Sequence, residues 1–237
     1  MLELILLIPA VAAAIALLNA RIAPWTSFVA ALAVLSLAID AALKVAAGAI
    51  LHGLGGALSL DAFAALYLLL VAFVGATAAL YSIGYIPVRR ERDTGSSAPR
   101  GRRYYTLFNV FLVSMLAIPL LANLAIIWIA IELTTVFSAF LVAWDDTAAS
   151  LEAAWKYVAL TTMGAMIALL GTLILYYGIS SAGQAPTWSG LAAAAPGMAP
   201  ALLLIAFVLW LVGFGAKAGL VPLHTWLPDA HSQAPAP

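Results

Sequence analysis

Hydrophobic residues in this sequence fall into long runs that are separated by short polar or Pro/Gly-containing segments. Seven runs are long enough to form membrane-crossing helices, and we predict them at residues 2–19, 25–47, 61–86, 104–121, 123–143, 151–178 and 200–221. A helix rises about 1.5 Å per residue, so about 20 apolar residues cross a hydrocarbon core of about 30 Å. The pattern predicts an all-α fold, a polytopic transmembrane helix bundle.

The fourth and fifth of these helices come from one apolar run, which extends from Tyr104 to Trp144. A run of this length exceeds one crossing of the bilayer. We divide it between Pro119 and Asn123, because proline breaks or kinks a helix.

The composition agrees with a membrane protein. Hydrophobic residues make up 65% of the chain, charged residues only 8%, and the mean hydropathy is +1.10, whereas about 25% of the residues of soluble domains are charged. The net charge is zero, so nothing indicates nucleic acid as a partner, and the lipid bilayer is the expected surroundings.

The chain contains no cysteine and only three histidines. It therefore has no disulfides and no cysteine ligands for zinc or an iron–sulfur cluster, and its histidines show no metal-ligand spacing. We expect no cofactor and no metal in this chain, so that any redox centre belongs to another subunit.

Basic residues predict the orientation of the helices, because short cytoplasmic loops are enriched in Lys and Arg. The segment from Pro87 to Arg103 is predicted to be cytoplasmic, which places the amino terminus outside and the carboxyl terminus inside. The first apolar run is expected to be a retained helix, because no basic region precedes it. The arginines of the loop are Arg89, Arg90, Arg92, Arg100, Arg102 and Arg103.

Two charged residues lie deep inside predicted helices, Glu132 in the fifth and Lys217 in the seventh. A charge near the centre of a bilayer costs several kcal/mol unless it is paired, hydrated or functional. Burial disfavours a charged lysine and a nearby carboxylate favours it, so moving the carboxylate would release a proton. A static pair that only fixes helix packing is the alternative, although buried pairs add little net stability.

Lys156 is a third candidate and lies near the start of the sixth predicted helix. Glu152 is four residues earlier and shares its helix face, so the two form either an interfacial ion pair or part of a proton path. Asp40 and Lys44 have the same spacing near the end of the second helix, and we interpret them as an interfacial pair. Hydroxyl groups between the charges would hold water or bond their own helix backbone; they belong to Thr134, Thr135, Ser138, Thr161 and Thr162.

The segment from Leu220 to His231 contains two prolines shortly after Lys217. They predict a broken helix, and irregular backbone at membrane depth occurs only inside protein or beside a water-filled cavity. His224 and His231 would then relay protons, since histidine titrates near neutral pH. The alternative is that each histidine is a hydrogen-bonded structural residue.

The residues from Lys217 to Pro235, which read KAGLVPLHTWLPDAHSQAP, closely resemble a signature of one family. It comprises the antiporter-like proton-translocating membrane subunits of complex I, multi-subunit sodium/proton antiporters and membrane-bound hydrogenases. Within that family the chain looks most like the F component of hydrogenase-4. The shorter stretches that carry this likeness are 81–85, 131–135, 151–157 and 213–215.

This resemblance implies a fold of three leading helices followed by two inverted five-helix repeats. Residues 1–103 would be the three leading helices with the Arg-rich cytoplasmic loop, and residues 104–237 an incomplete first repeat. Glu132 matches the glutamate of the family's fifth helix, and Lys217 matches the lysine of its broken seventh helix. Lys156 and His231 match polar positions beside the same path. The resemblance also implies a bacterial inner membrane, and the amino terminus, which the basic residues place outside, would then lie in the periplasm.

The implied function is proton translocation in a redox-driven complex of the hydrogenase-4 or NADH-quinone oxidoreductase type. The implied partners are the other membrane subunits, which carry the redox chemistry, and a separate chain that holds the second repeat. Two alternatives are a subunit of a sodium/proton antiporter and a truncated scaffold fragment, because the second repeat is absent from this sequence.

Overall fold

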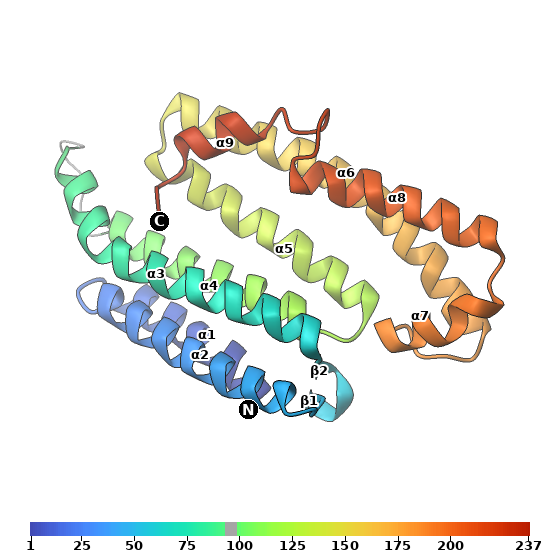
Figure 1. Cartoon of the computed structure of the whole chain (residues 1–237). Coiled ribbons are helices and arrows are strands. Elements are labelled where there is room, and N and C mark those ends of the chain that lie inside the picture. Colours follow the sequence, from blue (N-terminus) through green and yellow to red (C-terminus); the bar gives the residue numbers. More distant parts are fainter. Residues whose placement is uncertain (93–98) are drawn as a thin grey trace. The chain divides into compact units, whose positions relative to one another are not determined.

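The computed structural model describes residues 1–92 and 99–237 (Figure 1). Most of this part of the chain is helical. The helices are α1 (Leu2–Leu18), α2 (Ala23–Ala46), α3 (Ala62–Arg92), α4 (Pro99–Leu120), α5 (Leu124–Val142), α6 (Ala148–Ser181), α7 (Trp188–Ala194), α8 (Pro200–Ala218) and α9 (Leu227–Gln233). Single 3-10 turns lie at Leu54–Gly56, Ala143–Asp145 and Ala195–Gly197, and two short strands are β1 (Leu51–Gly53) and β2 (Leu58–Leu60).

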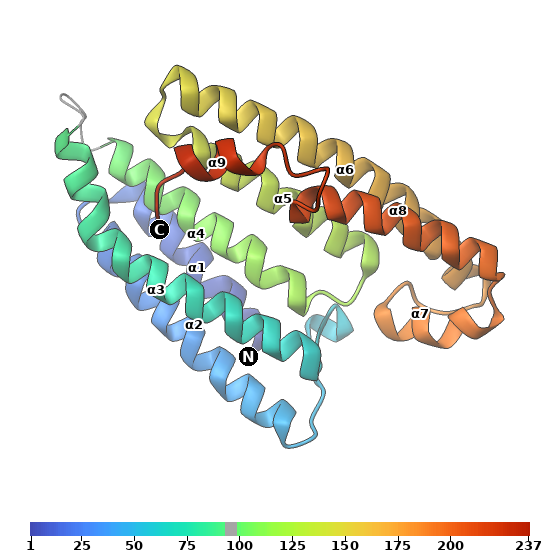
Figure 2. The same cartoon turned by 45° about the horizontal axis from the view of Figure 1, so that its top comes forward.

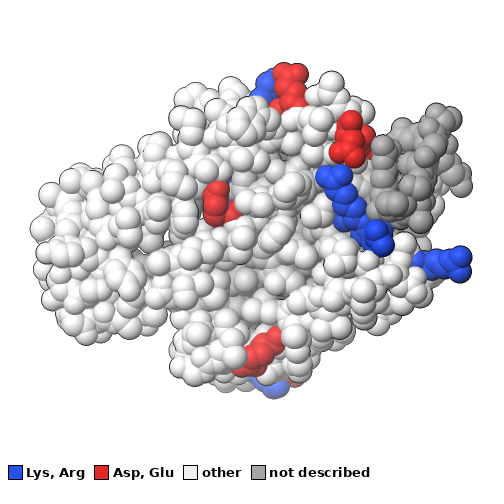
Figure 3. Space-filling view, turned by 180° about the vertical axis from the view of Figure 1, so that it is seen from behind, with Lys and Arg blue, Asp and Glu red and all other residues white. Residues whose placement is uncertain are grey.

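All seven predicted helices are present, which confirms the helical membrane fold. In the described residues, six helices are long and apolar enough to cross a membrane, and α1 is a shorter apolar helix of 17 residues. No more than 44% of the most apolar window of any of the six is buried inside the protein. Much of the apolar surface therefore faces outward, and charged side chains form only small groups on the face shown in Figure 3.

The division between the fourth and fifth helices lies where it was predicted, although the proline does not cause the break. Pro119 lies inside the last turn of α4, and α5 begins after Asn123. The Asn123 side-chain oxygen accepts hydrogen bonds from the backbone nitrogens of Ala125 (2.9 Å) and Ile126 (3.3 Å). This N-cap satisfies free donors of the new helix and fixes its start.

The chain forms two compact units, Met1–Leu120 with Pro235–Pro237, and Leu121–Ala234. The first unit contains α1 to α4 and an antiparallel hairpin of β1 and β2, which the sequence pattern did not predict. Buried polar contacts join its helices: the Asn109 amide donates to Ser27 Oγ at 2.6 Å, and the hydroxyls of Ser82 and Tyr104 are 2.8 Å apart.

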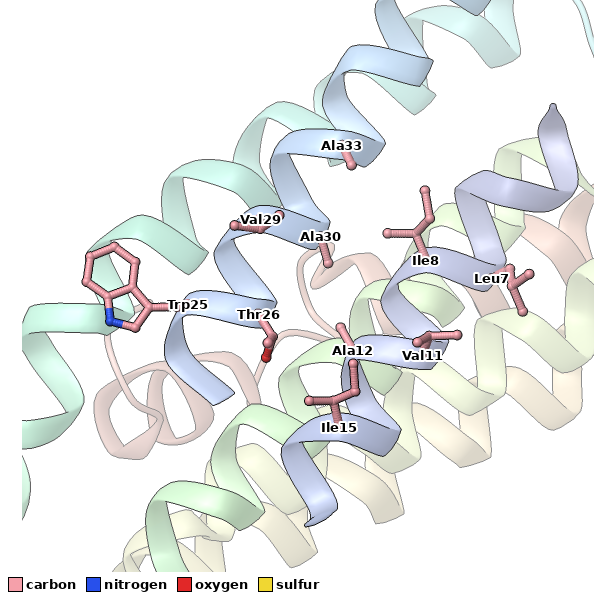
Figure 4. A pocket seen from close by; sticks show the side chains of 10 residues that line it. All are labelled: Leu7, Ile8, Val11, Ala12, Ile15, Trp25, Thr26, Val29, Ala30 and Ala33. Carbon is pink, nitrogen blue, oxygen red and sulfur yellow. The ribbon is translucent and has the colours of Figure 1, made fainter. Parts of the chain in front are cut away.

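An apolar groove of about 540 Å³ lies between α1 and α2 in the first unit (Figure 4). Branched side chains such as Ile8 and Ile15 line it from α1, and small residues such as Ala30 and Ala33 line it from α2. The groove contains almost no polar atoms, as expected of a surface solvated by lipid.

The second unit is built around α5, α6 and α8. In both Figure 1 and Figure 2, α8 lies alongside α6, and glycines bring the two backbones close together. A Cβ atom added at Gly213 would lie 2.6 Å from the Gly164 carbonyl oxygen, and one added at Gly171 would lie 3.0 Å from the Ala206 carbonyl oxygen. Membrane helices pack in this way when small residues face each other.

The connection from α6 to α8 is also hydrogen-bonded to the start of α5. Thr187 pairs with Asn123 in an isolated β-bridge, and the Leu124 nitrogen donates to the Pro186 carbonyl at 3.0 Å. The short helix α7 in this connection was not predicted. Gly190 within it allows a close approach, since a Cβ atom there would be 1.8 Å from the Ala185 carbonyl oxygen.

Two predictions stay untested by the fold. The first is the orientation of the helices in the membrane, which was predicted from the Arg-rich loop. The side chains of four of its arginines lie outside the described residues: Arg89, Arg90, Arg92 and Arg100. The second is the domain boundary after residue 103, which was predicted as the start of a repeat. A division of the chain into compact units does not test where a repeat begins.

Candidate functional site

The end of α8 shows the predicted break. Gly219 caps the helix in the left-handed conformation (φ 73°), where a residue without a side chain is favoured. The chain then has no regular helix until α9 begins at Leu227, and Pro228 occupies the second position of α9. A lysine in the last turn of α8, Lys217, is therefore followed at once by irregular backbone.

Lys217 is half-buried and reaches from α8 to α5. Its ammonium group donates a hydrogen bond to the hydroxyl of Thr135, a fully buried residue. Its position in the last turn of a helix also suits a cation, because the unpaired carbonyl groups there carry partial negative charge.

Glu132 is half-buried on α5, one turn before Thr135. Its Oε1 accepts a hydrogen bond from the Thr162 hydroxyl of α6 at 2.7 Å. Its Oε2 is buried and receives no hydrogen bond, so one strong acceptor is left open. Because Lys217 bonds Thr135, one turn from Glu132 on α5, the structure places the two charges that the sequence singled out beside neighbouring turns of the same helix.

The hydroxyl groups near these charges divide into two classes. Thr162 and Thr135 bond the charged side chains. Thr134, Ser138 and Thr161 instead donate to carbonyl groups one turn earlier in their own helices, at 2.6 Å each, which is the common behaviour of such residues in helices.

Tyr157 on α6 is a member of this site that the sequence analysis missed. Its hydroxyl lies 2.8 Å from Ser138 Oγ of α5. Its ring packs against Trp226, with 4.8 Å between the ring centroids. The Trp226 indole donates to the Ala216 carbonyl at 2.8 Å, so an aromatic pair connects the broken segment to both α6 and α8.

Lys156 lies elsewhere, on an exposed part of α6. Its ammonium group contacts Glu152 at 2.8 Å, the ion pair that was one of the two alternatives for this residue, and Asp229 of α9 at 2.9 Å. The second partner is 73 residues away in the sequence and was not predicted. The interfacial pair of Asp40 and Lys44 is also present, at 2.7 Å.

The two histidines differ in their surroundings. His224 is half-buried in the irregular segment, and its Nδ1 atom is buried without a hydrogen-bond partner. His231 is exposed in the last turn of α9. Within the described residues, no three His, Asp or Glu side chains form a group that could hold a metal ion.

Comparison with known proteins links this geometry to one family. Residues 122–237 match the family model described as NADH:quinone oxidoreductase/Mrp antiporter, TM. The hydrogenase-4 component F homolog of Methylacidiphilum infernorum is 36% identical over 176 residues, which are 72% of this chain and 37% of that protein. The Na(+)/H(+) antiporter subunit A1 of Staphylococcus haemolyticus is 35% identical over 188 residues, 78% of this chain and 22% of that one.

Among solved structures, a chain of the membrane-bound sulfane sulfur reductase, an archaeal respiratory membrane complex, has the same fold. The TM-score is 0.82 at 22% identity, and the match covers 99% of this chain and 48% of that chain. The present sequence thus spans 37% and 22% of the two relatives and about half of the solved chain.

Proposed function

Residues 122–237 carry the membrane domain of the NADH:quinone oxidoreductase/Mrp antiporter family, and from this premise we propose that the chain translocates protons in a redox-driven complex. The hydrogenase-4 type is our preferred assignment, and the NADH-quinone oxidoreductase type is the closely related one. The relative from Methylacidiphilum infernorum, described as a hydrogenase-4 component F homolog, supports this choice.

The observation that carries the proposal is the placement of Lys217 and Glu132 beside neighbouring turns of α5. Each charged group is bonded to a threonine hydroxyl of a neighbouring helix, and the threonine that Lys217 bonds, Thr135, lies one turn from Glu132. The charge of one therefore affects how readily the other gains or loses a proton. Ionisable groups inside membrane helices commonly mark proton and ion pathways.

In this proposal the energy comes from partner subunits that hold the redox centres, and a further chain or segment supplies the second repeat. The solved chain with the same fold is part of a multi-subunit respiratory complex, which supports such partners. Lys156, His224 and His231 are proposed to pass protons between this pair and the membrane surface.

The test uses the complete complex that contains this chain, reconstituted in vesicles with a pH-sensitive dye inside. Glu132→Gln and Lys217→Met should each reduce coupled proton movement by at least about a hundredfold, the usual effect of removing a positioned proton-transfer group. Electron transfer and assembly should persist. Asp40→Asn is the control, because it alters an exposed ion pair in another unit. Normal proton movement in both site variants would refute the proposal.

A subunit of a sodium/proton antiporter is the second candidate, favoured by the likeness to the antiporter subunit of Staphylococcus haemolyticus. The two functions differ in what drives the ions. Proton movement that requires sodium and occurs without any electron donor would establish the antiporter, and proton movement that requires the electron donor would exclude it.

A further inference from the structure

Thr135 differs from its hydroxyl-bearing neighbours on α5 in what its side chain bonds. Thr134 and Ser138 donate to carbonyl groups one turn earlier in the same helix, at 2.6 Å each, as such residues commonly do. The Thr135 hydroxyl instead accepts a hydrogen bond from the Lys217 ammonium group of α8. Helix α5 therefore uses its neighbouring hydroxyls internally and offers this one to a charged side chain.

The contact of Lys217 with Thr135 gives the ammonium group its partner in the site. Thr135 is fully buried, and among the described residues it is the one hydrogen-bond partner of this group. Glu132 does not take that place, because its Oε1 bonds the Thr162 hydroxyl and its Oε2 receives no hydrogen bond. Since a buried charged group without a partner is costly, the Thr135 hydroxyl decides where the ammonium group lies.

The backbone that carries Lys217 is fixed independently of Thr135. The carbonyl group of the preceding residue, Ala216, accepts a hydrogen bond from the Trp226 indole at 2.8 Å. Trp226 is buried in a cluster that contains residues of α5 and α6. The end of α8 is therefore held in place, and the remaining freedom of Lys217 lies in its flexible side chain.

A hydroxyl group suits a lysine that changes its charge. An ammonium group only donates hydrogen bonds, whereas a neutral amine has a lone pair that accepts one. A carboxylate or a carbonyl group has no proton to offer that lone pair, and the attraction of a carboxylate falls when the lysine loses its charge. A hydroxyl can accept from the ammonium group and donate to the amine.

We propose that Thr135 is a positioning residue that keeps the Lys217 nitrogen beside α5 in both of its charge states. The inference rests on the proposed function of the site. In the charged state the Thr135 oxygen accepts, as in the structure. When Lys217 has passed on its proton, the Thr135 hydroxyl turns and donates a hydrogen bond to the amine. Thr135 neither gains nor loses a proton, and Lys217 stays one turn of α5 from Glu132 throughout.

Thr135→Val tests this role in the complete complex in vesicles, because valine has nearly the same shape and no hydroxyl. We expect coupled proton movement to fall about tenfold, the rate equivalent of losing one hydrogen bond to a charged group. Thr135→Ser keeps the hydroxyl and should retain the parent rate. Thr134→Val is the matched control and should also retain it, since Thr134 is buried on the same helix but bonds a backbone carbonyl. Electron transfer should persist in all three variants.

Two results for the rate would overturn the inference. One is proton movement at the parent rate in Thr135→Val. The other is an equal loss in Thr135→Ser or in Thr134→Val, which would show that packing matters and the hydroxyl does not.

The melting temperature separates positioning from a structural role. Thr135→Val and Thr134→Val each remove one buried hydroxyl and should melt alike; a slower rate with a lower melting temperature in Thr135→Val alone would make the hydroxyl a structural group and overturn the inference. The variants Glu132→Gln and Lys217→Met test the proposed function itself. If they abolish proton movement while Thr135→Val does not, only the role of Thr135 fails.

Discussion

Gly213 controls how closely α8 approaches α6, and Gly213→Ala tests whether that distance matters for the site. The added Cβ atom would lie 2.5 Å from the Ala168 nitrogen and 2.6 Å from the Gly164 carbonyl oxygen. Ordinary contacts of a Cβ atom begin at 3.4 Å, so the backbones would have to separate by about 0.9 Å, which is 3.4 minus 2.5 Å. Backbone atoms cannot turn aside as a flexible side chain can.

Such overpacking costs about 1–3 kcal/mol, which lowers the melting temperature by about 2–12 °C at 2–4 °C per kcal/mol for a chain of this size. Lys217 lies one helical turn after Gly213 and shares its face, so the shift would also draw the ammonium group away from Thr135. Misplacement by about 1 Å reduces a proton or group transfer by up to roughly a hundredfold.

The assay measures the melting temperature in detergent and the rate of coupled proton movement in vesicles. Gly84→Ala in α3 is the control, because a Cβ atom there meets nothing within 4 Å and alanine favours a helix over glycine. If Gly213→Ala matched the parent in both measurements, the close packing of α6 and α8 would not position the lysine.

Two further variants concern single contacts. Thr162→Val should reduce coupled proton movement roughly tenfold, because it leaves the buried Glu132 carboxylate without its hydroxyl donor. Thr161→Val is the control, since the Thr161 hydroxyl bonds only backbone carbonyls. Equal rates for the two variants would contradict the role of the donor. Asp229→Asn should lower the melting temperature less than Gly213→Ala does. The pair of Asp229 with Lys156 is exposed, and Lys156 keeps Glu152 of its own helix as a partner. A larger fall in the melting temperature would show that this ion pair holds α9 in place.

The helices and the charged pair could be predicted because each leaves a local signal. Runs of about 20 apolar residues mark the crossings, and a charge inside such a run is rare enough to stand out. Glu132 and Lys217 were found in this way. The broken helix was found from Pro222 and Pro228, because proline acts on the backbone within one turn.

Contacts between distant segments could not be predicted in the same way. Which residues of α6 face the site depends on how the helix is rotated against its neighbours, and an apolar helix carries little pattern to reveal this. Tyr157 and Trp226 were therefore indistinguishable from aromatic residues at the membrane surface. The pairing of Lys156 with Asp229 joins helices 73 residues apart, whereas its pairing with Glu152 needs only the spacing within one helix.

The short elements were missed for a different reason. The strands β1 and β2 have three residues each, and α7 has seven. Segments this short contain too few turns of a helix or alternations of a strand for a sequence pattern to distinguish them from a loop.

The connection between α6 and α8 offers a practical handle on sidedness. Gly190 in α7 admits no side chain without displacing backbone, whereas a Cβ atom at Gly197, just beyond that helix, meets nothing within 4 Å. Since this sequence contains no cysteine, a thiol introduced at position 197 would be the one site within it that a membrane-impermeant maleimide could label. Its reactivity in intact cells would tell directly which compartment this connection faces.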